Sequence, residues 1–254
     1  MPPILPTPMP LYRALRLGSG LVLWLYMASH LLNHALGVVS LDVAEQGLRV
    51  AVAVWHSAVG TLFLYGAFAL HVLLAMLGLY QRHTLRLPAV ELLRIGAGLS
   101  IPMLLVGHAV ATRMAYEWYG HLPHYARVVT SLLHTGAAGR QLALLAPGWL
   151  HGCMGLHMAA RKNAVYQRWR WFALGAAVLL PCLAAGGYLQ MVREASAALA
   201  AAPSGSALRA ATEAAQTQAL DSLRLQILTA YGALLALVLL ARGVRRVHQH
   251  RISA

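Results

Sequence analysis

Histidines inside apolar segments are the residues of this sequence whose type and spacing indicate chemistry. Seven of the thirteen histidines lie in the first four of six long apolar runs. An ionisable side chain in a membrane-spanning segment is costly and usually faces the interior of a helix bundle with a partner. One alone is more often a polar residue that hydrogen-bonds a neighbouring helix. Seven over four consecutive runs indicate a shared site instead: His30, His34, His56, His71, His108, His151 and His157.

Three kinds of chemistry could use these histidines. A proton relay would need Asp or Glu among them, and the four runs contain almost no acidic residue. A zinc or copper site usually has closely spaced ligands, a spacing that His30 and His34 show at i, i+4. Haem iron needs one axial imidazole from each side of the macrocycle. That requirement favours single histidines on facing helices, in a four-helix core.

Depth along the predicted helices pairs four of the histidines. His30 lies about 3 Å and His108 about 6 Å outward of the midpoints of the first and third runs, so they can face each other. His71 lies about 7 Å to the inner side of the midpoint of the second run. In the fourth run His151 is near mid-depth and His157 about 8 Å inward, so either can oppose His71. One outer and one inner pair is the arrangement of two stacked b-type haems.

The elements that must position these residues are the apolar runs. Of 254 residues, 59% are hydrophobic and 11% charged, against about 45–50% and about 25% in average soluble domains. This composition excludes a water-soluble globule and a disordered chain. Leu- and Ala-rich runs without two-residue alternation exclude a β-barrel. We therefore expect an all-α polytopic membrane protein with six transmembrane helices and a haem-binding core of the first four: 17–39, 53–80, 92–115, 141–161, 170–191 and 224–242.

The distribution of charge predicts the orientation. The formal net charge is +13, from 20 Lys and Arg against seven Asp and Glu. Thirteen of the 20 basic residues lie at one set of ends of the runs, and six of the seven acidic residues lie on the other side. The positive-inside rule then places both termini in the cytoplasm, and the positive charge does not indicate nucleic acid. Cys153 and Cys182 lie inside apolar runs and predict neither a disulfide nor a cysteine metal site.

Further residues are candidates for holding the groups around such haems. Propionates need cations: Arg113 lies one turn beyond His108, and Arg82 and Arg161 lie at inner ends, where plain anchoring is the alternative role. Small residues let a flat group or a helix approach closely: Gly37, Gly60, Gly78, Gly107, Gly152 and Gly155.

The outer connection 116–140 carries aromatic residues and histidines. They could form a lid over the outer pair, or be an ordinary interfacial belt: Tyr116, Trp118, Tyr119, His121 and His124.

Four motifs in order resemble the dihaem cytochrome b anchors of succinate dehydrogenases and fumarate reductases. The stretch from Trp149 to Leu156 resembles their His-Gly-x-x-Gly-Leu motif, and His108 to Arg113 resembles their third-helix His followed by Thr-Arg. His30-Leu31-Leu32-Asn33 and Leu70-His71 are similar to the ligand segments of the first and second helices. The resemblance implies two haem b groups, with iron held by His30 and His108 in the outer one and by His71 and His151 in the inner one.

A closer resemblance is to the six-helix membrane anchors of bacterial adenylate cyclases. The stretches Ser29 to Gly37 and Trp149 to His157 carry it. In that group the anchor is followed by a ferredoxin-like domain and a class III cyclase domain. The present sequence contains neither the four-cysteine set nor the cyclase carboxylates, so cyclase activity is not assigned to these residues. The chain is either an anchor region or a stand-alone cytochrome.

The resemblance implies a bacterial inner-membrane protein in five parts. These are a cytoplasmic N-terminus (1–16), a five-helix cytochrome-b-like haem domain (17–191), a periplasmic connection with a helix at 207–223 (192–223), a sixth transmembrane helix (224–242), and a basic cytoplasmic end leading to a partner (243–254).

The expected function is electron exchange with quinone, or sensing of quinone redox state, as the anchor of an adenylate cyclase. The alternatives are an anchor subunit of a succinate dehydrogenase or fumarate reductase complex, and a haem-free ligand receptor. Expected partners are lipids, quinone and a cytoplasmic cyclase module or iron–sulfur subunit, with a homodimer as a further candidate. His34 and His157 are candidate contacts to quinone or propionates, with interhelical hydrogen bonding as the alternative, and His56 has no assigned role.

Overall fold

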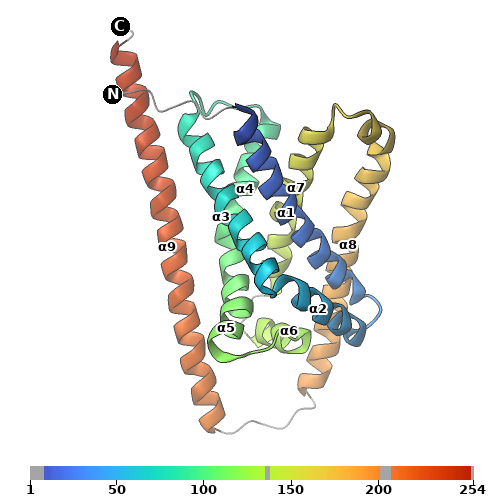
Figure 1. Cartoon of the computed structure of the whole chain (residues 1–254). Helices are drawn as coiled ribbons and strands as arrows, with labels where there is room; N and C mark the ends of the chain where they lie inside the picture. Colours follow the sequence, from blue (N-terminus) through green and yellow to red (C-terminus); the bar gives the residue numbers. More distant parts are fainter. Residues whose placement is uncertain (1–8, 135–137, 201–206, 253–254) are drawn as a thin grey trace.

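The computed structural model describes residues 9–134, 138–200 and 207–252, and within these ranges its regular structure is helical, with no strand. Figure 1 shows the arrangement of the helices. In chain order they are α1 (Met9–Leu36), α2 (Leu41–Trp55), α3 (Ala58–Gln81), α4 (Ala89–Ala109), the π-helical turn η1 (Val110–Met114), α5 (Ala115–Tyr119), α6 (Tyr125–His134), α7 (Ala138–Ala160), α8 (Ala164–Ala200) and α9 (Ala207–Ile252).

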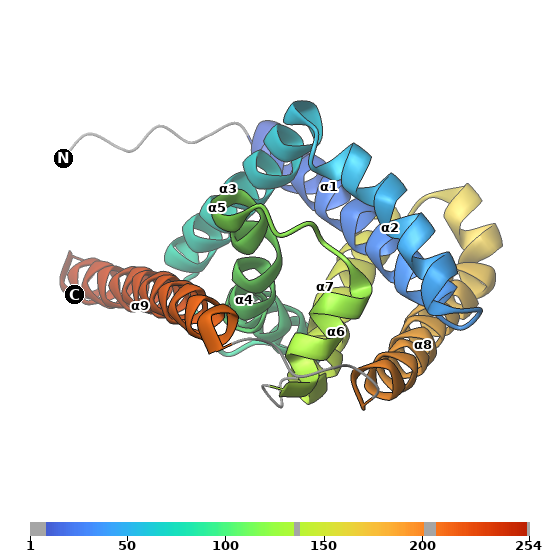
Figure 2. The same cartoon turned by 90° about the horizontal axis from the view of Figure 1, so that it is seen from below.

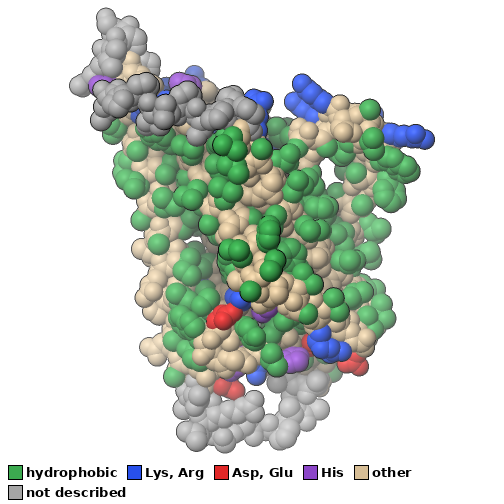
Figure 3. Space-filling model, viewed as in Figure 1, with side chains coloured by type: hydrophobic (Ala, Val, Ile, Leu, Met, Phe, Trp, Pro, Cys, Tyr) green, Lys and Arg blue, Asp and Glu red, His purple; other side chains and the backbone are tan. Residues whose placement is uncertain are grey.

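Five helical segments are long and apolar enough to cross a membrane. They are Leu11–Leu36, Ala58–Gln81, Ala89–Tyr119, Ala164–Ala197 and Glu213–Gln249. Large apolar side chains on them face outward, with Leu62 72% and Phe172 74% exposed, and charged side chains gather toward the two ends of the molecule (Figure 3). A soluble monomer rarely exposes such apolar area. The expected all-α fold is confirmed, and it is compatible with a multi-pass membrane protein. The predicted run 141–161 corresponds to α7, which is not among the five, so six spans remain a prediction.

The long helices alternate in direction. Figure 1 shows α1 beginning and α9 ending at the same end of the molecule, which we call the inner end, with α2, α5 and α6 at the opposite, outer end. Helix α1 packs against α3, α7 and α8, and α4 packs against α7. Helix α9 stands at the edge, against α3 and α4 (Figures 1 and 2).

One outer segment contains more helix than the sequence predicts, and another follows the prediction. The second apolar run was expected from residue 53, but the structure ends α2 at Trp55 and begins α3 at Ala58. Both starts are capped: Ser40 Oγ accepts from the Val43 amide at 3.2 Å, and Ser57 Oγ accepts from the Gly60 amide at 3.0 Å. In the connection 192–223, the expected helix 207–223 is continuous with the last span as α9.

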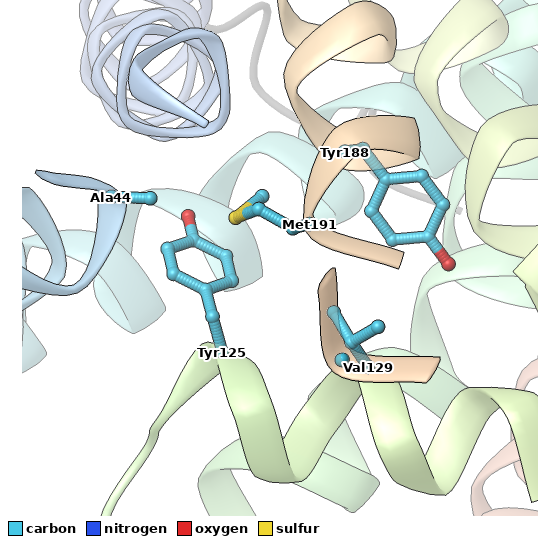
Figure 4. Close-up of a cluster of buried hydrophobic side chains, with 6 residues drawn as sticks. Ala44, Tyr125, Val129, Tyr188 and Met191 are labelled. Carbon is cyan, nitrogen blue, oxygen red and sulfur yellow. The ribbon is translucent and has the colours of Figure 1, made fainter. Parts of the chain in front are cut away.

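Helix α8 is held to the bundle by close packing near the outer end. A Cβ on Gly187 would lie 2.0 Å from the His34 carbonyl oxygen, so only glycine allows this approach of α8 to α1. Below it, α2, α6 and α8 enclose a cluster of buried side chains that includes Tyr125, Val129 and Met191 (Figure 4). These contacts position the α1 segment that carries His30 and His34.

Candidate functional site

His71 of α3 and His151 of α7 form an inner pair, with ring centroids 6.1 Å apart and ring planes perpendicular. The Nδ1 of His151 lies 2.9 Å from the Arg94 carbonyl oxygen. Because a carbonyl only accepts, Nδ1 is the protonated nitrogen and Nε2 keeps its lone pair. The Nδ1 of His71 lies 3.1 Å from Ser19 Oγ, whose hydroxyl donates to the Arg16 carbonyl at 3.2 Å. Both Nδ1 atoms are thus engaged through N–H donors, which leaves both Nε2 atoms available as ligands.

Two glycines give the inner pair its space. A Cβ on Gly98 of α4 would lie 2.6 Å from His151 Cε1, and a Cβ on Gly20 of α1 would lie 3.2 Å from His71 Cε1. A side chain at Gly98 therefore cannot coexist with the observed ring position, and one at Gly20 would press on it. Gly96 and Gly18, two residues earlier on the same helices, meet no atom within 4 Å. Neither Gly20 nor Gly98 stands out in the sequence, because their role depends on which neighbouring helix approaches them.

His30 of α1 and His108 of α4 form an outer pair, with ring centroids 5.7 Å apart and an interplanar angle of 73°. The His30 ring also contacts two others on its own helix. Tyr26 stacks on it at 5.7 Å, and His34 Nε2 lies 3.2 Å from His30 Nε2. The i, i+4 pair that suggested a compact metal site is therefore in contact. Among the described residues, no group of three or more His, Cys, Asp or Glu could hold a metal ion.

A buried polar cluster adjoins the outer pair. Asn33 Nδ2 donates to the Tyr125 hydroxyl at 2.7 Å, and the His34 ring lies 5.3 Å from the Tyr125 ring. Burial, the largest effect, raises the pKa of Tyr125, which lies outside the spanning helices, and the Asn33 bond opposes it. Within the described ranges, three buried polar atoms here have no hydrogen-bond partner: Asn33 Oδ1, His34 Nδ1 and the Tyr188 hydroxyl. Unsatisfied buried groups are costly, so this cluster can accept a further polar group.

The centroid separations of the two pairs are compatible with a metal held between two imidazoles. With a metal–nitrogen distance of about 2 Å on each side and about 1 Å from nitrogen to ring centroid, the two centroids are about 6 Å apart. The observed 5.7 and 6.1 Å agree with this value. A second feature fits an anionic group beside the inner pair, because Arg94 Nε is buried without a partner.

The predicted propionate partners lie in different surroundings. Arg113 bonds Glu117 at 2.7 Å and Thr61 Oγ1 at 3.2 Å, near the outer pair's end of the molecule. Arg82 bonds Glu91 at 2.5 Å, and Arg161 is exposed after α7. Arg94 lies at the inner pair, where its backbone carbonyl bonds His151 and its Nε is buried without a partner among the described residues. In the sequence it is only a basic residue near the start of a helix.

The remaining predicted histidines lie apart from the two pairs. His157 is exposed and bonds the Tyr166 hydroxyl at 2.8 Å. His56 caps the end of α2 against Tyr116, with ring centroids 5.2 Å apart. Burial, followed by the charge of Arg113, lowers the pKa of His56.

The predicted lid residues lie on a segment that crosses the outer end of the helices (Figure 2). His121 Nε2 lies 2.8 Å from Gln216 Oε1 of α9, and His124 Nδ1 lies 3.5 Å from Glu45 Oε2 of α2. Gly120 ends α5 directly before these attachments with a φ of 65°, a conformation that favours glycine. The segment is thus tied to two helices on opposite sides of the bundle.

Comparisons with protein-family models, curated proteins and solved structures found no match for this chain.

Proposed function

We propose that this chain is a membrane cytochrome b that holds two haem b groups between four histidines. The observation that carries the proposal is the meeting of four separate helices in two histidine pairs, at 5.7 and 6.1 Å. His30 and His108 would hold the outer iron, and His71 and His151 the inner iron. In the outer pair His30 Nε2 lies 3.2 Å from His34 Nε2 and would exchange that contact for the iron.

The chain's own residues fix the ligands and shield them. Ser19 and the Arg94 carbonyl hold the Nδ1 protons of the inner pair, which sets the tautomer and aims both Nε2 atoms. Arg94 Nε would hold a propionate of the inner group. When bound, haem b with two imidazole ligands supplies one-electron transfer, since no axial position is open for oxygen or substrate.

We further propose that the electrons are exchanged with a quinone near the outer pair. A membrane-embedded redox protein meets quinones readily, and the cluster of Asn33, His34 and Tyr188 offers unsatisfied polar atoms beside His30. A quinone carbonyl can accept a hydrogen bond from His34 Nδ1–H or from the Tyr188 hydroxyl, and a quinol hydroxyl can donate to Asn33 Oδ1. The segment of His121 and His124 would cover this site.

The signalling part of the proposal rests on the resemblance to cyclase anchors. Helix α9 runs without a break from the outer end to the inner end, so it can carry a change at the outer end toward a cytoplasmic ferredoxin-like and cyclase module. We propose a bacterial inner membrane, six spans including α7, and both termini in the cytoplasm. The same-side placement of the start of α1 and the end of α9 supports that topology (Figure 1).

A reduced-minus-oxidised absorbance spectrum with haem quantitation per chain tests the proposal. We expect two low-spin haems per chain, reducible by quinol in detergent. One haem, or a high-spin spectrum, would contradict the ligand set. Protein without haem would favour a receptor whose histidines only shape a pocket. Haem that no quinol reduces would remove the quinone part alone.

A further inference from the structure

A cavity of 540 Å³ lies at the inner end, between the segment that joins α3 to α4 and the last turns of α9. It is far from the outer pair and is not lined by any of the four paired histidines. In the described part of the chain, its lining residues are Thr84, Leu85, Arg86, Arg242 and Arg246. Three of these five carry a positive charge, and none carries a negative one.

Arg242 is the feature that distinguishes this cavity from an ordinary basic membrane surface. The residue is only 7% exposed, and its Nε donates to the Arg82 carbonyl at 3.0 Å. Its NH2 nitrogen is buried and has no hydrogen-bond partner among the residues that the structure describes. A buried charge without a partner is strongly unfavourable, whereas an anchoring arginine would extend its charged end into water.

The nearby carboxylate does not fill this need. Glu91 is engaged by two other arginines, at 2.5 Å from Arg82 and 3.5 Å from Arg94. Arg245, the neighbour of the cavity on α9, lies over the Tyr80 ring at 5.2 Å and adds further positive charge nearby. The cavity thus combines a buried guanidinium with one unpartnered nitrogen, two exposed arginines (Arg86 and Arg246) and a hydroxyl from Thr84.

We propose that this cavity binds a phosphate group, with Arg242 as its buried anchor and Arg86 and Arg246 closing over it. Guanidinium groups match phosphate oxygens in geometry and charge. The position at the inner end, where the apolar surface of the helices stops, suits the phosphate of an anionic lipid headgroup. A free phosphate or phosphate ester of the aqueous phase has the same chemistry. This inference is independent of the haem proposal.

The test uses the full chain purified in a neutral detergent, with two probes. Inorganic phosphate represents the soluble source, and short-chain phosphatidylglycerol represents the lipid source, with short-chain phosphatidylcholine as the zwitterionic control. Affinity is measured by calorimetric titration and by the rise in thermal unfolding midpoint. We expect Arg242→Gln to weaken binding about tenfold or more, since a hydrogen bond to a charged group contributes about 1.5–3 kcal/mol.

Three further variants complete the test: two at exposed arginines of the cavity and one at a distant arginine. Arg86→Gln and Arg246→Gln should each weaken binding a few-fold, because exposed ion pairs contribute less. They also keep the test valid if Arg242→Gln disturbs folding. The matched control is Arg168→Gln, an exposed arginine on α8 outside the cavity, which should leave binding unchanged.

The outcomes separate the sources of phosphate. Binding of phosphatidylglycerol alone supports the site and assigns it to a lipid headgroup. Binding of inorganic phosphate alone supports the site and assigns it to a phosphate of the aqueous phase. Binding of both probes supports a phosphate site that accepts either source. The proposal is overturned if neither probe binds the native chain, or if the substitutions at the cavity leave binding unchanged.

Discussion

Replacing Gly98 with alanine should remove the inner haem and leave the outer one. The added Cβ would lie 2.6 Å from His151 Cε1 and 2.8 Å from its Nδ1, whereas carbon atoms pack at about 3.5–4.0 Å. The ring must therefore move by about 1 Å. A shift of that size breaks the 2.9 Å bond to the Arg94 carbonyl or turns Nε2 away from His71. Loss of such a supporting contact lowers metal affinity about 10–100-fold.

The chain contains its own graded controls. Gly20→Ala places a Cβ 3.2 Å from His71 Cε1, only a few tenths of an ångström too close, so we expect a few-fold loss of affinity. Gly96→Ala and Gly18→Ala meet no atom within 4 Å and should keep both haems. As helix-interior substitutions they should also stabilise the fold by up to about 1 kcal/mol each.

Haem per chain, measured from the pyridine haemochrome spectrum of each purified variant, is the assay. The expected order of inner-haem retention is Gly96→Ala and Gly18→Ala first, then Gly20→Ala, then Gly98→Ala. Two haems bound with native affinity in Gly98→Ala would refute the role of the inner pair. Equal loss in Gly96→Ala would show that any added methyl group on α4 disturbs the bundle.

Three further predictions concern the pairs, the lid and the outer cluster. Replacing either member of a pair with alanine should remove the haem of that pair. If His151→Ala keeps both haems and His157→Ala loses one, then His157 and not His151 is the ligand on the fourth predicted span. His121→Ala and His124→Ala should slow stopped-flow haem reduction by quinol without removing haem, and an unchanged rate would leave that segment as an interfacial belt. Tyr125→Phe should cost about 1–3 kcal/mol by depriving Asn33 of its partner, as measured by chemical unfolding. Burial raises the pKa of Tyr125 above 10.0, so above pH 10 the folded chain keeps a proton that the unfolded chain loses, and the free energy of unfolding falls as pH rises. In Tyr125→Phe this fall should be smaller by up to about 1.4 kcal/mol per pH unit. A fall as steep as that of the native chain would contradict the raised pKa.

The sequence predicts the large features because they follow from additive physics. Apolar length predicts which segments are long helices, and depth at 1.5 Å per residue predicts which histidines can be level with each other. The structure brings His30 to His108 and His71 to His151, as that depth argument expects. Of the two candidates opposite His71, His157 instead lies exposed against Tyr166. Depth alone left that choice open.

The sequence does not predict features that depend on how helices rotate against one another. Ser19 and Gly98 matter because α1 and α4 turn these residues toward the histidines, and hydropathy gives no rotation for helices that are apolar on most sides. The helix α2 begins before the predicted run for a different reason, because at 15 residues it is too short to span a membrane. Its polar residues Asp42, Glu45 and Arg49 recur at helical spacing, and Ser40 is a capping residue type.

The surroundings of the two pairs differ, and this difference is the basis for placing the proposed quinone beside the outer pair. In the inner pair both Nδ1 atoms have partners in the backbone or in Ser19, and glycines fix the space around the rings. In the outer pair His30 contacts His34, and the adjoining cluster contains unsatisfied polar atoms. A preorganised ligand set suits a cofactor that only relays electrons, whereas an adaptable polar surrounding suits a site where a second molecule must bind and leave. The quinone site is therefore expected beside the outer pair, and the inner pair is expected to pass electrons toward the inner end, where α9 and the cytoplasmic partner would meet.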